Sequence, residues 1–360
     1  MAEQKSNLTA AQRAALFAQA TRQNMQMLPK QTINTGSNTV EFTLPKARLL
    51  SKILIAFKLK FKATHASKTE LPNIDVFTPY EIIKKISVDI NNGFSPYVIG
   101  GKECAMLNMT HRHDAEYIKY ASENTEDTNK IGYWKGQKAS TTGAENEVAF
   151  TLELPITLND RDSIGAILLQ NEQTVVNASI SIGEIADMFK DNNGYTYEFN
   201  SMEIVPMVES FSIPASASAF PDLSVLKLVN SRKESWLSSG QQVVKLSTGT
   251  IYRKIIFMLT DAQGNPLADE DINDIQLVFN QADCNYSINP RLLRILNTTQ
   301  YGFTLPKGMY VLDFGYQGIV GLSGSRDYVD TERLTECWLR FTTKDAGFVN
   351  IVTETLARLQ

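Results

Sequence analysis

The sequence has few of the residues on which catalytic and metal sites usually depend. Its 360 residues include three cysteines, Cys104, Cys284 and Cys337, and only three histidines. An odd number of widely spaced cysteines argues against a disulfide framework and against a zinc site. No P-loop, Rossmann or nucleophile-elbow motif occurs. We therefore expect no cofactor, no bound metal and no enzymatic activity.

An excess of one charge and long apolar runs are also absent. Lys and Arg number 35 against 39 Asp and Glu, a net charge of −4, which argues against a dedicated nucleic-acid partner. Lysines interrupt the longest apolar stretches, such as Ile53–Phe61, so no membrane span of about 18 residues is expected. The first 30 residues lack the apolar core of a secretory signal. The few cysteines suit synthesis in a reducing cytoplasm.

The N-terminal segment, residues 1–35, predicts a helical arm. Residues 10–28 are rich in Ala, Gln, Leu and Met, which are good helix formers, and they contain no Gly or Pro. Asn7 or Thr9 could cap the start of this helix, and Pro29 would stop it.

The arm carries only basic charge between Glu3 and Glu41. A basic, weakly amphipathic helix can lie on an anionic membrane surface, or it can dock on a neighbouring subunit, and the pattern leaves both open. The residues that we expect to contact a membrane or a neighbour are Arg13, Phe17, Arg22, Leu28 and Lys30.

After the arm, apolar and polar residues alternate along many short segments. In Leu49–Thr64, three apolar side chains, Phe57, Leu59 and Phe61, alternate with lysines, as in a strand with one buried face. Clusters of Gly, Pro, Asn and Asp separate the segments, which is typical of a β-sandwich or barrel. Further strands are expected at Asn38–Leu44, Ile82–Ile90, Glu147–Leu158, Thr174–Ile182, Tyr195–Ile213, Ser224–Val229, Gln242–Leu246, Ile251–Thr260, Ile272–Phe279, Lys307–Phe314, Leu334–Thr342 and Gly347–Thr353.

One part of the first half of the chain is repeated in the second half. Ile86–Thr110 aligns without a gap with Ile275–Thr299, at an offset of 189 residues and with seven identities in 25 pairs. In both copies a strand leads to an Asn, then to a short Tyr-x-Ile segment and a helix. A period of half the chain indicates a duplicated domain.

The duplication and a Pro/Ala/Ser-rich linker near residues 214–222 divide the chain. We expect two tandem eight-stranded jelly-roll sandwiches, at residues 36–214 and 222–360, each with an inserted helix. A further short helix is expected at Asp114–Ser122, within the long polar segment between Thr110 and Asn146.

Two short stretches resemble the major capsid proteins of tectivirus-type bacteriophages, which are tailless and contain a membrane. These stretches are Asn7–Leu16, followed by a Gln- and Met-rich segment, and Leu305–Tyr310, followed by a strand and a Gly-rich segment. The resemblance implies a double jelly roll whose pseudo-hexagonal homotrimers tile an icosahedral shell around an internal membrane. It also implies a virion location, contact of the N-terminal arm with the membrane, and penton or minor capsid proteins as partners.

Two other classes of function remain open. One is a receptor- or glycan-binding phage module, for which Tyr117, Tyr120, Tyr133 and Trp134 offer aromatic side chains. The other is an amidase-type enzyme on two jelly rolls, which would need several acidic side chains facing a cleft between the sandwiches. The acidic pairs Glu126–Asp127 and Asp269–Asp271 could serve a glycosidase, which needs two carboxylates across a cleft, but they are also typical of solvated loops. His111 and His113 would share a face if they lay on a strand, but no third metal ligand is visible nearby.

Overall fold

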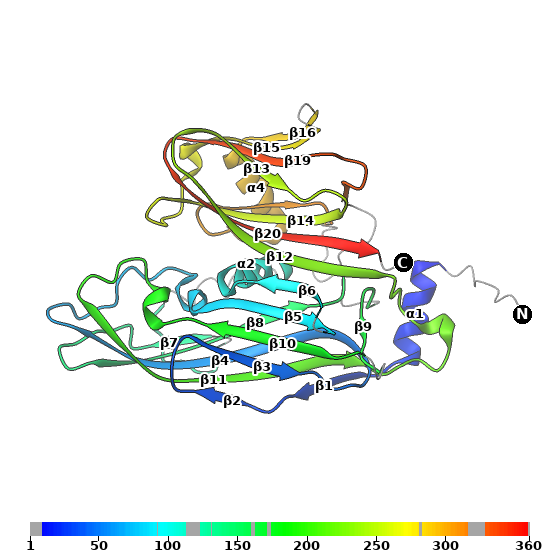
Figure 1. The fold of residues 1–360 in the computed structure, drawn as a ribbon, viewed down its shortest axis with the longest axis horizontal. Helices are drawn as coiled ribbons and strands as arrows, with labels where there is room; N and C mark the ends of the chain where they lie inside the picture. Colours follow the sequence, from blue (N-terminus) through cyan, green and yellow to red (C-terminus); the bar gives the residue numbers. More distant parts are fainter. Residues whose placement is uncertain are drawn as a thin grey trace, which may run out of the picture.

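The computed structural model describes residues 9–91, 93–112, 123–130, 132–159, 163–170, 174–280, 283–315 and 328–358. Two β-sandwiches stack on one another, with their strands running along the long axis of the molecule (Figure 1). The fold is therefore the all-β double jelly roll that the sequence predicts. Among the described residues, no helix has the length and apolar character needed to cross a membrane.

The first sandwich has two facing sheets. One has the order β1-β11-β4-β8-β7, with β2 also beside β11 and β9 beside β4. The other has the order β6-β5-β10-β3. The bounds are β1 Gln23–Met27, β2 Gln31–Ile33, β3 Asn38–Thr43, β4 Leu49–His65, β5 Ile83–Ile90, β6 Phe94–Ile99, β7 Tyr133–Lys135, β8 Ala144–Pro155, β9 Ile167–Leu168, β10 Val176–Ile182 and β11 Tyr195–Phe211, with 3₁₀ turns η1 Thr78–Ile82 and η2 Ile185–Met188.

The second sandwich is built in the same way. One sheet has the order β17-β14-β20-β12, with β18 beside β14, and the other has the order β13-β19-β15-β16. The bounds are β12 Val225–Trp236, β13 Gly240–Leu246, β14 Ile251–Asp261, β15 Ile272–Phe279, β16 Asp283–Ile288, β17 Met309–Asp313, β18 Val329–Asp330, β19 Cys337–Thr343 and β20 Gly347–Arg358, with 3₁₀ turns η3 Ala217–Ala219 and η4 Asp269–Asp271.

The duplication seen in the sequence is confirmed residue by residue. The repeated unit is β5-β6-α2 in the first sandwich and β15-β16-α4 in the second, where α2 is Gly101–Arg112 and α4 is Pro290–Tyr301. Every boundary of one copy lies 189 residues from its counterpart. Asn91 and Asn280, which directly follow the first strand of each copy, both have a positive φ, of 55° and 48°. Asn tolerates this left-handed conformation better than most residues do, which explains its use at both turns.

A buried asparagine ties the helix of each copy to a strand. Asn108 of α2 donates a hydrogen bond to the backbone carbonyl of Glu153 in β8, at 2.7 Å, and accepts one from its N–H, at 2.8 Å. Asn297 of α4 makes the same pair of bonds to Val311 in β17, at 2.9 and 3.0 Å. In each case the side chain satisfies backbone groups at the edge of a sheet, which would otherwise be left unpaired.

The predicted helix at residues 10–28 is wrong in its second half. Helix α1 covers only Ala10–Ala20, starts with a capping box at Thr9 and is closed by the Thr21 hydroxyl, which donates to Phe17 O at 2.7 Å. Residues 23–27 instead form β1, which pairs antiparallel with β11. Pairing with an open sheet edge outweighs a modest helix propensity. The helix expected at Asp114–Ser122 lies outside the described residues.

Candidate assembly surfaces

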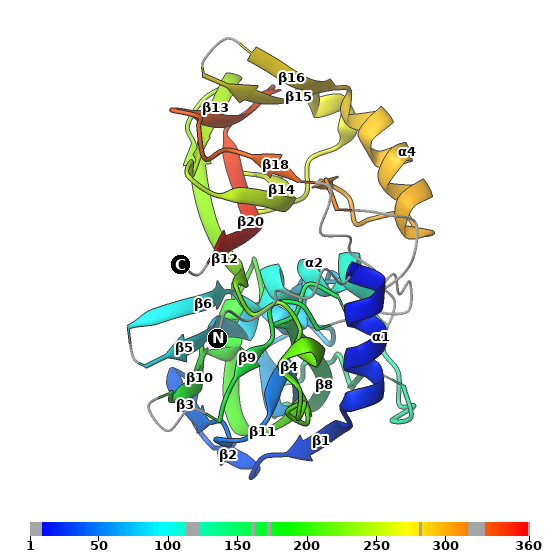
Figure 2. The same cartoon turned by 90° about the vertical axis from the view of Figure 1, so that its right-hand side faces the viewer.

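The two sandwiches meet through one continuous sheet. Strand β12 of the second sandwich runs parallel to β6 of the first, with Val229 opposite Tyr97, so that nine strands form a single sheet across both. Helix α2 lies between the sandwiches beside this joint (Figures 1 and 2). Its Met106 and Leu107 are fully buried, in the same apolar cluster as many side chains of the second sandwich, among them Ile256, Met258, Met309, Val311 and Val352.

Charged side chains are buried at the same junction. Lys254 Nζ lies 3.0 Å from Asp313 Oδ2 and donates to the Thr110 hydroxyl of α2 at 3.3 Å. Tyr301 OH also donates to Asp313, at 2.7 Å. Burial alone would raise the pKa of Asp313, but the charge of Lys254 and these hydrogen bonds hold it below its usual value. The junction therefore depends on an ionised carboxylate that is almost inaccessible to solvent.

The five arm residues do not share one environment. The side chains of Phe17 and Leu28 are buried within the chain, only 3% and 7% exposed. Phe17 stacks edge-on against Phe211 at 5.2 Å and packs on Leu49 and Ala166. Arg13, Arg22 and Lys30 are exposed, and Lys30 pairs with Glu203 at 3.2 Å. Of the five, only these three basic residues are accessible for contact with a membrane or a neighbour.

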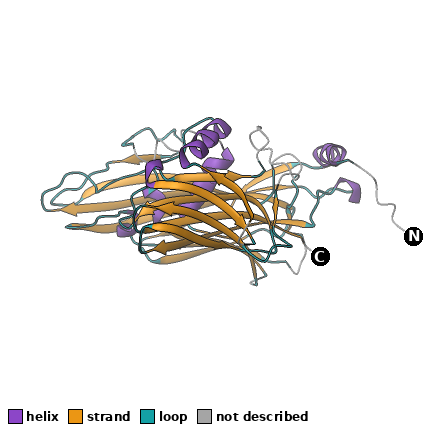
Figure 3. Cartoon of the chain, turned by 90° about the horizontal axis from the view of Figure 1, so that it is seen from above, coloured by secondary structure: helices purple, strands orange, loops and turns teal. Residues whose placement is uncertain are grey.

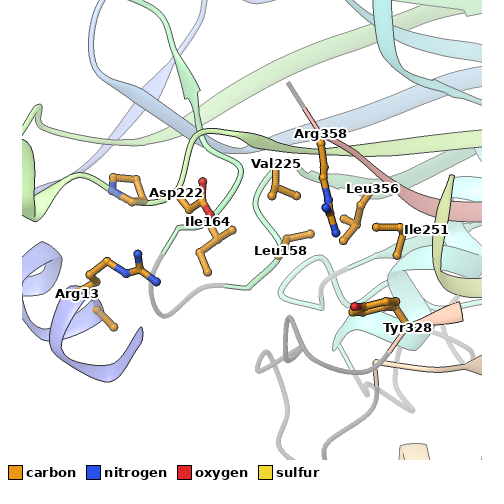
Figure 4. Close-up of a pocket in the computed structure, with 11 residues that line it drawn as sticks. Arg13, Leu158, Ile164, Asp222, Val225, Ile251, Tyr328, Leu356 and Arg358 are labelled. Carbon is orange, nitrogen blue, oxygen red and sulfur yellow. The ribbon is translucent and has the colours of Figure 1, made fainter. Parts of the chain in front are cut away.

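An apolar groove of about 180 Å³ lies beside α1, at the end of the molecule near the C-terminus. Leu158, Ile164, Ile251 and Leu356 are among its apolar lining residues, and Arg13 and Arg358 flank them (Figure 4). Figure 3 shows that α1, the helix nearest the N-terminus, lies beyond the ends of the strands, beside the short turn η3 and away from the helices at the middle of the molecule. This end of the molecule thus combines exposed positive charge with an apolar surface.

Other candidate residues have structural partners. Trp134 is fully buried and Tyr133 is 8% exposed, so neither offers an aromatic platform at the surface, and Tyr117 and Tyr120 lie outside the described residues. Asp269 accepts hydrogen bonds from Arg294 and Tyr310, which anchors η4 to α4 and β17.

Of the two histidines His111 and His113, His111 lies on a helix rather than on a strand. His111 is in the last turn of α2, with Nδ1 3.7 Å from Glu153 Oε1, and His113 lies outside the described residues. Within the part of the chain that the structure describes, no group of three His, Cys, Asp or Glu side chains could hold a metal ion.

Two exposed apolar surfaces in the described part of the chain were not anticipated. Leu292, Ile295 and Leu296 on α4 are 62%, 55% and 47% exposed. Met25 and Met27 on β1 are 58% and 68% exposed. The sequence does contain a signal for the first surface: the segment Leu292–Leu296 has apolar residues on both faces of its helix, since Leu293 points into the sandwich.

Solved structures with the same fold match almost the whole chain, although no protein-family profile and no curated protein sequence matches it. The MCP of STIV, the Sulfolobus turreted icosahedral virus, is 13% identical with a TM-score of 0.69, over 94% of this chain and 97% of that one. The Faustovirus major capsid protein is 9% identical with a TM-score of 0.61, over 94% and 90%. The major capsid protein P2 of bacteriophage PM2 is 11% identical with a TM-score of 0.55, over 94% and 98%.

Proposed function

We propose that this chain is a major capsid protein. The observation that supports this most directly is the double jelly roll itself, which matches those three viral proteins over at least 90% of both chains. The exposed apolar surfaces on α4 and β1 are of the kind that marks protein–protein contacts. In this function the chain acts by assembly and not by catalysis.

The assembly unit in this proposal is a homotrimer, in which six sandwiches form a pseudo-hexagonal ring. Such trimers would tile an icosahedral shell in the virion, with penton or minor capsid proteins at positions that the trimer does not fill, after synthesis in the host cytoplasm. A head-to-tail contact that closes after three copies gives this symmetry without a second type of interface.

The mass of the purified protein, measured by light scattering at several concentrations, tests this proposal. We expect about three times 40.2 kDa, independent of concentration in the micromolar range. Assembly of these trimers into shells or sheets, visible by negative-stain electron microscopy, is expected under crowding or at lowered salt. A monomer at all concentrations would count against the capsid function.

We further propose that the end carrying α1 faces an internal membrane. The exposed Arg13 and Arg22, with Arg358 beside the apolar groove, suit an anionic lipid surface. The protein should float with vesicles that contain phosphatidylglycerol more than with vesicles of phosphatidylcholine alone. Arg13→Glu together with Arg358→Glu should remove this difference, whereas the control Lys130→Glu, at an exposed loop position, should not. Equal flotation of parent and double variant would contradict the lipid contact.

A further inference from the structure

The outer face of α4 has an exact counterpart in α2, and in α2 that face is covered. The offset of 189 places Leu292, Ile295 and Leu296 at the positions of Glu103, Met106 and Leu107. In α2, Glu103 accepts a hydrogen bond from Asn350 of β20, and Thr110 accepts one from Lys254 of β14, so this face of the helix meets the second sandwich. Met106 and Leu107 lie between Glu103 and Thr110 on the same face and are fully buried. The same face of the same repeated helix is therefore covered in one copy of the repeat and exposed in the other.

The surface that covers α2 also has a counterpart in the first sandwich. The paired asparagines fix the alignment, because Asn108 bonds Glu153 and Asn297 bonds Val311. Glu153 lies opposite Leu54 of β4, and Val311 lies opposite Ile256 of β14. Leu54 is thus equivalent to Ile256. On the next strand of each sheet, Met207 of β11 lies opposite Leu54 and Val352 of β20 lies opposite Ile256, so these two residues are also equivalent. Two residues earlier on the same strands, Val205 and Asn350 are equivalent as well.

This counterpart surface is open, and its centre is apolar between two Lys–Glu pairs, Lys52 with Glu209 and Lys58 with Glu203. It is the outer face of β1, β11 and β4, and Val205, Met207 and Leu54 on it are only partly buried. Ala56, Met25 and Met27 on the same face are exposed. The polarity of one residue pair changes on the helix face and on the sheet face together. Inside the chain the pair is polar, Glu103 with Asn350, and on the exposed faces the equivalent pair is apolar, Leu292 with Val205. Both exposed faces therefore present apolar side chains at the positions whose equivalents meet inside the chain.

We infer that the α4 face of one copy docks on the outer face of β1, β11 and β4 in the next copy, repeating between chains the contact that α2 makes within the chain. This inference rests on the proposed homotrimer and identifies the surfaces that form it. Figure 2 shows α4 on the outside of the second sandwich, while α2 lies between the two sandwiches. The partner is a second copy, because the chain itself contains both complementary faces.

The same equivalence predicts how the sheets of two copies join. Strands β6 and β12, each at the edge of its own sandwich, pair with each other inside the chain. Their counterparts, β16 and β1, each lie at the end of a sheet. In the first sandwich, Met25 lies opposite Glu209, which lies opposite Lys52. In the second sandwich, Val229 lies opposite Glu354, which lies opposite Lys254. Met25 and Val229 therefore occupy equivalent positions. The pairing of Val229 with Tyr97 inside the chain thus corresponds to a pairing between chains, of Met25 in one copy with Tyr286 in the next.

Substitutions on α4 test the docked face. Leu292→Glu should weaken each contact by at least about 30-fold and shift the light-scattering mass from trimer to monomer at micromolar concentration. Leu237→Glu is the matched control, because Leu237 is 93% exposed and lies on neither face; it should remain trimeric. Adding Val205→Asn to Leu292→Glu recreates the polar pair found inside the chain and should restore the trimer. Thermal melting of each variant checks that the sandwiches remain folded.

A cross-link tests the strand pairing independently. In a Cys284→Ser background, which removes the exposed native thiol beside the site, Gln26→Cys with Ser287→Cys should form an interchain disulfide under mild oxidation. These two positions are equivalent to the paired Asn230 and Val98. Neighbouring strands bring such residues within the distance that a disulfide needs. Leu237→Cys with Ser287→Cys should not cross-link.

The outcomes separate this inference from the proposed function. A parent trimer that becomes monomeric with Leu292→Glu, recovers with Val205→Asn and forms the cross-link supports both. A trimer that persists with Leu292→Glu overturns the assigned faces but leaves the trimer itself standing. A monomer that Val205→Asn does not rescue overturns the receiving face, and a monomeric parent overturns both.

Discussion

Removal of the Asn297 side chain gives a direct measure of how each helix is held on its sandwich. In Asn297→Ala, the N–H and C=O groups of Val311 lose their partners at 3.0 and 2.9 Å, while Val311 remains about as buried as it is now, at 1% exposed. Leaving a buried backbone group unpaired costs about 1–3 kcal/mol. The two losses share one side chain, so we expect a decrease of about 3 kcal/mol in the free energy of unfolding of the second sandwich.

Urea unfolding followed by circular dichroism measures this decrease, at one fixed protein concentration because association adds to stability. Hydrogen exchange, read by mass spectrometry on peptides that cover Met309–Asp313, locates it. A loss of about 3 kcal/mol corresponds to roughly 150-fold faster exchange in these peptides. Asn108→Ala should produce the same change in the first sandwich, around Glu153, because its two bonds are of similar length.

Asn129→Ala, at an exposed loop position, is the control and should change stability by less than about 0.5 kcal/mol. The two hydrogen bonds of Asn297 do not hold α4 in place if Asn297→Ala is as stable as this control, or if exchange around Val311 stays as slow as in the parent. Either result would mean that apolar packing alone positions α4.

Three further predictions concern the junction, the arm and the start of α2. The charge of Lys254 lowers the pKa of Asp313 in the folded chain. The stability that the ionised Asp313 contributes is therefore present above the unfolded pKa of about 3.9 and is lost as the pH falls through the lower folded value. The melting temperature should decrease when the pH falls below about 4, and it should decrease less in Asp313→Asn. Deletion of residues 1–21 removes the Phe17 contacts and should lower the free energy of unfolding by about 2–4 kcal/mol. Deletion of residues 1–30 also removes β1 and so exposes the edge of β11, which should give aggregated protein in size-exclusion chromatography. Gly101→Ala would place a Cβ 2.3 Å from Tyr80 O and should lower the melting temperature, unlike Gly93→Ala, whose Cβ would meet nothing closer than 3.8 Å.

The sequence predicts the strands well wherever one face of a strand is buried. Along β4, the side chains of Phe57, Leu59 and Phe61 are buried and alternate with lysines, and this alternation sets both the strand and its register. The repeat was equally visible, because two turns with the same backbone geometry require Asn at the same position, Asn91 and Asn280.

The arm shows where local reasoning fails. Nothing within residues 23–27 distinguishes a strand from a continued helix, since Met and Gln favour helices and the segment has no Gly or Pro. Its partner, β11, lies about 180 residues away, and the antiparallel pairing from Gln23–Phe211 to Met27–Met207 decides the outcome. The burial of Phe17 and Leu28 has the same origin, because the surfaces that cover them come from distant parts of the chain.

The duplication connects the fold of this chain to its proposed assembly. A repeated unit inherits the same helix face and the same sheet face twice, but a single chain can bring only one such pair together: α2 on the sheet of the second sandwich. The remaining pair, the α4 face and the outer face of β1, β11 and β4, can meet only across a boundary between chains. Since a head-to-tail contact either closes into a ring or continues as an open filament, the angle between the two sandwiches sets the number of copies. Six sandwiches related by equal steps close as three chains, and the contact within the chain is then the template for the contact between chains.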